Sequence, residues 1–145
     1  MRTCRRLLTA VFAVLVLIGA AALVHKPVSA RPLEVGYFST VQADRGQAAF
    51  GEHCAVCHET TELSGTDFEY RWRRQTAWNL YRYVSQAMPE DLPGSLEDDV
   101  YVDLVAYLLQ GNGYPAGDTE LNPTRESLGE VPLGPDADKT GETHP

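Results

Sequence analysis

Cysteine and methionine are scarce in this sequence. Its 145 residues contain three cysteines and two methionines, and Cys4 and Met1 lie in the N-terminal segment. Only Cys54, Cys57 and Met88 remain beyond it. A single bridge between neighbouring cysteines would constrain little of the unfolded chain. This excludes a fold held together by several disulfides, and it makes a bulky buried cofactor the expected stabilising element of a small domain.

Long apolar runs are also absent, except at the N-terminus. Arg2, Arg5 and Arg6 precede an apolar run over residues 7–24, and the small residues 28–30 follow. This order is typical of an export signal with a cleavage site after Ala30. The run also approaches the length of a membrane span, ~20 residues. Cleavage and retention as an N-terminal anchor both remain open, and either places the remainder in the periplasm or another extracytoplasmic space.

Basic residues are few after residue 30. Eight of the 12 Lys and Arg residues and all 20 Asp and Glu residues follow it, so that part has a formal net charge of −12. Such a charge disfavours binding to nucleic acid and to anionic lipid. It favours a partner with a basic docking patch, although solubility alone also explains it.

The sequence lacks a convincing strand pattern and an internal repeat. Apolar residues recur at helical spacing over residues 41–54 and 76–87, where Thr76 is a suitable N-cap. A third helix is predicted to begin at a capping box over residues 95–98 and to end with Gly111 at its C′ position. Residues 59–67 and 88–94 are predicted as loops because they are polar or rich in proline. The expected fold is all-α, with three main helices and long loops.

This pattern divides the chain into four parts. Residues 1–30 form the signal peptide or anchor, residues 31–39 a linker and residues 40–120 the domain. Residues 121–145 are rich in Pro, Gly and acidic residues, and they are predicted to form a flexible tail.

Three kinds of chemistry compete for the segment Cys54-Ala55-Val56-Cys57-His58. A redox dithiol of the thioredoxin type follows a strand within a βαβ unit, and here the motif follows a predicted helix. A structural zinc site needs four ligands, and the chain has no second C-x-x-C. C-x-x-C-H is the attachment signature of c-type haem. Two thiols three positions apart lie on one side of a helical turn, and His58 can then reach the iron. The haem interpretation is favoured.

A haem iron needs a sixth ligand, and Met88 is the only methionine after the leader. It follows a predicted helix and lies in a proline-bounded loop, so its sulfur can reach the opposite ring face. His53 precedes the attachment motif and is interpreted as a surface residue, and His144 lies in the tail. Ligation by His58 and Met88 would close both axial positions and raise the potential relative to harder ligand sets. The expected role is therefore electron transfer and not catalysis.

The segments "GQAAFGEHCAVCH", "MPEDLPGSL" and "YVDLVAYLLQGNGYPAG" resemble those of class I cytochromes c. The resemblance covers roughly residues 40–120 and implies one covalent haem c, bound through Cys54 and Cys57, within the class I cytochrome c fold. In that family the first and last helices cross, and Gly46 and Phe50 match one side of the crossing and Leu104 and Tyr107 the other. The last two segments also resemble small cytochromes associated with quinoprotein (PQQ) dehydrogenases. That similarity implies a redox donor of this kind and a terminal oxidase as acceptor.

The resemblance leaves open which groups orient the haem histidine and which bind the haem propionates. Many class I cytochromes carry a proline after the haem histidine whose carbonyl orients the imidazole, and residues 59–68 contain none. Haem propionates need hydrogen-bond donors, and Trp72 or Arg74 is predicted to supply at least one. The alternative for these two residues is a solvated basic face.

Two other functions stay open at this point. One is an open-site haem enzyme or gas-binding haem protein in which Met88 does not bind iron. The other is a thiol–disulfide protein without haem that uses Cys54 and Cys57.

Overall fold

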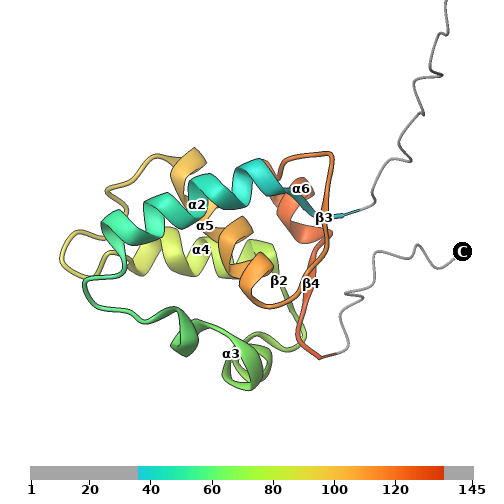
Figure 1. Ribbon diagram of the computed structural model, residues 1–145, viewed down its shortest axis with the longest axis horizontal. Coiled ribbons are helices and arrows are strands. Elements are labelled where there is room, and N and C mark those ends of the chain that lie inside the picture. Colours follow the sequence, from blue (N-terminus) through green and yellow to red (C-terminus); the bar gives the residue numbers. More distant parts are fainter. Residues whose placement is uncertain (1–35, 136–145) are drawn as a thin grey trace, which may run out of the picture. The chain divides into compact units, whose positions relative to one another are not determined.

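The computed structural model describes residues 36–135 (Figure 1). The predictions for the leader at residues 1–30, the first part of the linker, and residues 136–145 of the tail lie outside this range. None of the helices in this range has both the length and the hydropathy of a membrane span. Helices dominate, which agrees with the all-α prediction. In chain order the elements are β1 (Phe38–Ser39), α2 (Thr40–His53), the 3₁₀-helix η1 (Thr60–Leu63), α3 (Gly65–Trp72), β2 (Gln75–Thr76), α4 (Ala77–Ala87), α5 (Asp98–Gly111), β3 (Ala116–Gly117), α6 (Arg125–Gly129) and β4 (Pro132–Leu133).

Helices α2 and α5 pack closely against each other and form the centre of the core. A Cβ atom on Gly46 would lie 1.9 Å from the Asp103 carbonyl oxygen and 2.9 Å from the Tyr107 Cβ, so only glycine permits this approach. One turn along α2, the Phe50 and Tyr107 rings lie 5.5 Å apart between centroids. The predicted crossing of the first and last main helices is thereby confirmed for these residues.

A charged cluster also joins α2 to α5. Arg45 donates from Nε to Asp103 at 2.7 Å and from a terminal nitrogen to Glu120 at 2.9 Å. Asp103 is buried, whereas Glu120 is about half exposed. Because Arg45 holds both carboxylates, it connects the helix pair to the segment that follows β3.

We expect Glu120 to contribute to the loss of folding stability at acidic pH. Hydrogen bonding from Arg45 lowers its pKa below the usual value, so the folded state binds this proton less readily than the unfolded state. This stabilisation is present above the unfolded pKa of about 4.3 and is lost as the pH falls through the lowered folded pKa. A Glu120→Gln variant should therefore lose less stability than the wild type as the pH falls through the range in which Glu120 is protonated.

The effect should be small because Glu120 is exposed to solvent. Urea unfolding at several pH values measures it. Glu126→Gln serves as a control, because the structure describes no ion pair for Glu126. Equal pH slopes in the two variants would contradict the prediction.

The last main helix differs from its prediction at both ends. The predicted capping box at residues 95–98 is wrong: α5 begins at Asp98, and its N-cap, Glu97, makes no side-chain cap hydrogen bond. The Leu96 N–H instead donates to the Tyr101 hydroxyl at 3.4 Å. Gly111 is the last helical residue and not the C′ residue, and the left-handed φ of +78° occurs at Gly113.

The predicted loop over residues 59–67 is only partly correct. It contains η1, and α3 begins within it at Gly65. Phe68 and Trp72 lie four residues apart on α3 and are both buried, so tertiary packing stabilises a helix whose polar start suggested a loop. The Asn112 side chain accepts from the Gly65 N–H at 2.9 Å and donates to the Leu63 carbonyl at 3.0 Å. The C-terminal end of α5 thus holds the start of α3.

The predicted boundaries of the domain are too narrow at both ends. Phe38 is fully buried, and β1 pairs in parallel with β3, so the end of the predicted linker belongs to the fold. The predicted flexible tail is wrong for residues 121–135. This part contains α6 and β4, and β4 pairs antiparallel with β2. It also buries four widely spaced apolar side chains: Leu121, Leu128, Val131 and Leu133.

Candidate functional site

The C-x-x-C-H segment forms a compact turn at the end of α2. Cys54 is the C-cap of the helix, and its N–H bonds to the Phe50 carbonyl at 2.9 Å. The Cys54 carbonyl then accepts the N–H groups of Cys57 at 3.0 Å and His58 at 2.9 Å. Both thiols are free, one half-buried and the other exposed, and burial raises the pKa of the Cys54 thiol. The turn thus gathers two unpaired thiols and one imidazole within five residues.

The His58 ring lies beside a carboxylate. Its Nδ1 atom is 3.8 Å from Oε2 of Glu62 on η1, and both side chains are partly exposed. This distance is longer than a hydrogen bond. Metal-bound histidines commonly donate their other ring N–H to a carboxylate or a carbonyl. Glu62 is thus a carboxylate near this ring that the sequence prediction did not name, and the structure describes no hydrogen bond between the two side chains.

Met88 is the C-cap of α4, and both of its backbone polar groups are bonded. Its N–H donates to the Val84 carbonyl at 3.0 Å, and its carbonyl accepts the Tyr101 hydroxyl at 2.8 Å and the Gly94 N–H at 3.5 Å. The Met88 side chain is partly exposed. The loop over residues 88–94 has the irregular conformation that its prolines predicted. Tyr101, on α5, was not named by the sequence prediction as a residue of this region.

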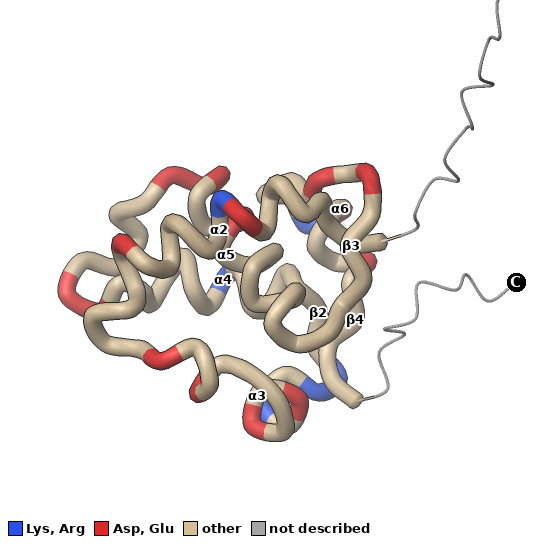
Figure 2. The backbone as a smooth tube through the Cα atoms, in the orientation of Figure 1, with Lys and Arg blue, Asp and Glu red and all other residues tan. Residues whose placement is uncertain are grey.

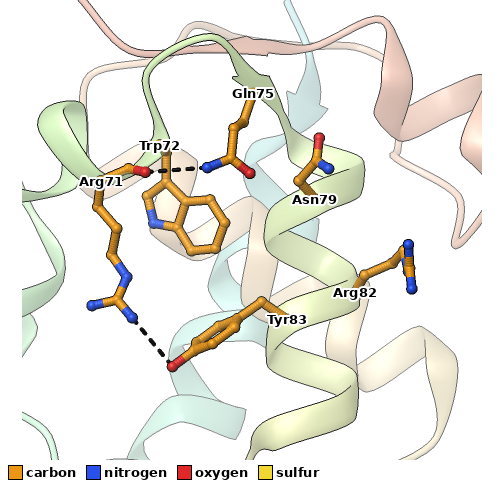
Figure 3. Close-up of a pocket in the computed structure, with 6 residues that line it drawn as sticks. All are labelled: Arg71, Trp72, Gln75, Asn79, Arg82 and Tyr83. Atoms are coloured by element: carbon orange, nitrogen blue, oxygen red, sulfur yellow. Dashed lines mark hydrogen bonds between the residues drawn. The ribbon is translucent and has the colours of Figure 1, made fainter.

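A cavity of about 360 Å³ opens between the end of α3 and one face of α4 (Figure 3). The Trp72 ring meets the Tyr83 ring edge-on at 5.7 Å between centroids. Arg71 donates to the Tyr83 hydroxyl at 3.3 Å and lies over its ring. In Figure 3 Tyr83 projects from α4 toward Arg71 and Trp72, and Arg82 projects from the other side of this helix. The lining residues are Arg71, Trp72, Gln75, Asn79, Arg82 and Tyr83.

The cavity contains one of the two predicted propionate donors. Trp72 lines it, whereas Arg74 does not and instead adopts a left-handed φ of +63° in the turn after α3. Arg71 and Arg82 also line it. A role for Trp72 and Arg74 in binding propionates stays a prediction. None of Cys54, Cys57, His58 and Met88 lines this cavity.

The donor groups fit a covalently bound haem. Two free thiols suit thioether bonds, an imidazole and a thioether suit iron, and guanidinium groups suit carboxylates. Among residues 36–135 there is no group of three or more His, Cys, Asp or Glu side chains that could hold a metal ion.

Residues 41–108 match the family model described as cytochrome c oxidase, cbb3-type, subunit III. The matched range contains the C-x-x-C-H turn and Met88, and it ends within α5. No curated protein and no solved structure shows significant similarity to the chain. The match and the helical architecture together support a c-type cytochrome with a class I cytochrome c-like, all-α fold. Its cofactor is a covalently bound haem c with iron, and it acts as a haem c-type electron carrier.

Proposed function

We propose that this chain is an exported mono-haem cytochrome whose iron is ligated by His58 and Met88. Cys54 and Cys57 supply the two thioether bonds, and Trp72 with Arg71, Arg74 or Arg82 binds the propionates. The observation that carries this proposal is the turn at the end of α2, which gathers two free thiols and an imidazole inside the segment matched by the family model.

The roles of the chain's own residues follow from their positions. A haem bound here supplies a one-electron couple. The thiols at the C-terminal end of α2 would attach the haem to this helix, and His58 and Met88 would hold its iron. With both protein ligands bound, the iron would have no place for oxygen or peroxide. This arrangement supports electron transfer without catalysis at the iron.

The charge pattern supports a basic redox partner. Between Arg45 and Arg71, and again between Arg82 and Arg125, the chain has no Lys or Arg. Figure 2 shows acidic residues along the loops that follow α2 and α4, which carry the proposed haem ligands. A basic face on a donor or acceptor would be attracted to these loops.

We place the protein outside the cytoplasm because residues 1–30 have the pattern of an export signal, with anchoring through residues 7–24 if that segment is retained. The proposed donor is a periplasmic dehydrogenase, in particular a quinoprotein dehydrogenase. The proposed acceptor is a terminal oxidase, in keeping with the description of the matched family model.

Visible absorption spectra of the haem-loaded protein test the ligation. The wild type should show sharp reduced bands and the weak far-red band of sulfur bound to ferric iron. Met88→Ala should lose the far-red band and should bind carbon monoxide in the reduced state at least tenfold more readily, because one axial position opens. Leu92→Ala is the matched control, since Leu92 is exposed in the same loop.

Other outcomes identify the competing functions. A haem spectrum without the far-red band in the wild type, together with ready binding of carbon monoxide, would favour an open-site haem enzyme or gas-binding protein. A protein matured under the same conditions without haem would favour the thiol–disulfide alternative.

A further inference from the structure

Tyr101 connects α5 to the loop that carries the proposed sixth ligand. Its side chain is among the largest fully buried ones, at 2% exposed. Its hydroxyl donates to the Met88 carbonyl at 2.8 Å and accepts the Leu96 N–H at 3.4 Å. A buried phenol thereby bonds to both ends of the stretch over residues 88–96.

The first of these bonds acts directly on the residue that bears the sulfur. The Met88 N–H is already held by Val84 of α4, so the Tyr101 bond holds the second of its backbone groups. With both groups held, the Met88 backbone is fixed and the side chain retains only its own rotations. Losing the hydroxyl would leave the Met88 carbonyl with only the 3.5 Å contact from the Gly94 N–H. A partly buried carbonyl without a good donor is unfavourable, so the loop would move toward water.

We propose that Tyr101 is a positioning residue that keeps the Met88 loop closed and thereby strengthens the bond between the Met88 sulfur and the iron. This inference rests on the proposed ligation by Met88. The hydrogen bond raises the affinity of the Met88 sulfur for iron by preorganisation, because the loop spends less time in conformations from which the sulfur cannot bind. A competing ligand therefore displaces the sulfur less readily.

Displacement of Met88 by added imidazole tests the proposal. The haem-loaded ferric protein is titrated with imidazole, and loss of the far-red sulfur-to-iron band is followed. Tyr101→Phe keeps the ring in the core and removes only the hydroxyl. Its apparent Kd for imidazole should fall roughly tenfold, a factor that corresponds to about 1.4 kcal/mol.

Tyr81→Phe is the matched control. The Tyr81 hydroxyl donates to Asp98 at the start of α5 at 2.7 Å, and the Tyr81 side chain is also buried, but the structure describes no hydrogen bond from it to Met88. Burial, followed by this hydrogen bond, raises the pKa of Tyr81 to about 12. Removing the Tyr81 hydroxyl also removes one hydrogen bond to α5. The Kd for imidazole should nevertheless change less than twofold, because this bond does not involve Met88.

Amide hydrogen exchange gives a second readout that does not depend on the iron–sulfur bond. Exchange at Gly94 and Leu96 should accelerate in Tyr101→Phe and not in Tyr81→Phe, because only the first variant releases the loop. Urea unfolding of both variants separates a local effect from a general loss of stability.

The outcomes separate this inference from the ligation itself. A wild type without the far-red band would overturn both. A wild type with that band, with equal imidazole affinities in Tyr101→Phe and Tyr81→Phe, would overturn the positioning role alone. A tenfold difference between variants of similar stability would establish it.

Discussion

Gly46→Ala should destabilise the haem-loaded protein by about 3 kcal/mol or more. The new Cβ would lie 1.9 Å from the Asp103 carbonyl oxygen and 2.9 Å from the Tyr107 Cβ. The first of these atoms belongs to the backbone of α5, so no side-chain rotation relieves the clash and the two helices must separate. Alanine is intrinsically better than glycine within a helix by about 1 kcal/mol, which is too little to offset such overpacking.

Gly51→Ala is the matched control on the same helix. A Cβ there would meet nothing within 4 Å, so this variant should be stabilised by about 0.5–1 kcal/mol through helix propensity alone. Urea unfolding followed by circular dichroism compares the two. Similar midpoints for Gly46→Ala and Gly51→Ala would show that α2 and α5 do not approach each other as closely as described.

A chain that ends at Glu120 should lose most of its cooperative stability. It would lack four buried apolar side chains, each contributing about 1.5–3 kcal/mol on burial. The sum is roughly 6–12 kcal/mol, against a typical total stability of about 5–15 kcal/mol. Part of this loss is recovered because the missing residues no longer need to be ordered.

The same truncation also removes a pair of buried hydrogen bonds. The side chain of Gln42, 1% exposed, donates to the Leu121 carbonyl at 2.9 Å and accepts the Leu121 N–H at 2.8 Å. Without Leu121 this amide would be left unpaired or would draw water into the core, which adds to the cost.

Thermal unfolding of the truncated, haem-loaded protein measures this effect. A chain that ends at Pro135 is the control, because it keeps every contact that the structure describes for residues 36–135. Leu128→Ala is a milder variant for the case in which the short chain does not fold, and it should cost about 2–5 kcal/mol. An unchanged melting temperature in the chain ending at Glu120 would show that residues 121–135 do not stabilise the domain, as the sequence predicted for a tail.

Local sequence patterns were sufficient for the fold class and for the main helices. Apolar residues at helical spacing predicted α2 and α4 to within a few residues, because both helices bury one clear stripe. The resemblance to class I cytochromes c, through Gly46 and Phe50, implied where α5 crosses α2, and the structure agrees. The C-x-x-C-H motif needed no tertiary structure either, because thioether attachment depends on residues within a single turn. For the same reason the sequence alone led to a covalent haem c.

The tertiary structure decided what depends on contacts between distant parts of the chain. Residues 121–135 have a composition typical of a tail, yet four of their apolar side chains are buried, Leu121 is hydrogen-bonded to Gln42 of α2, and α6 packs against α4. A composition average cannot detect four well-placed side chains. The start of α5 was also mispredicted: Ser95 matches a capping pattern, but the helix begins at Asp98 and Glu97 is its N-cap.

Around the proposed site, too, the sequence predicted some residues and only the structure revealed others. Cys54, Cys57, His58 and Met88 were chosen from spacing and from their scarcity. Tyr101 and Glu62 were not, because a phenol on a helix and a glutamate in a polar loop have no distinctive sequence signal. Their roles arise only where the fold places Tyr101 against the Met88 carbonyl and Glu62 beside the His58 ring. The sequence determined the groups able to hold the cofactor. The packing of α5 placed Tyr101 against the Met88 backbone, and that of η1 placed Glu62 near His58, because both contacts join residues that no local pattern relates.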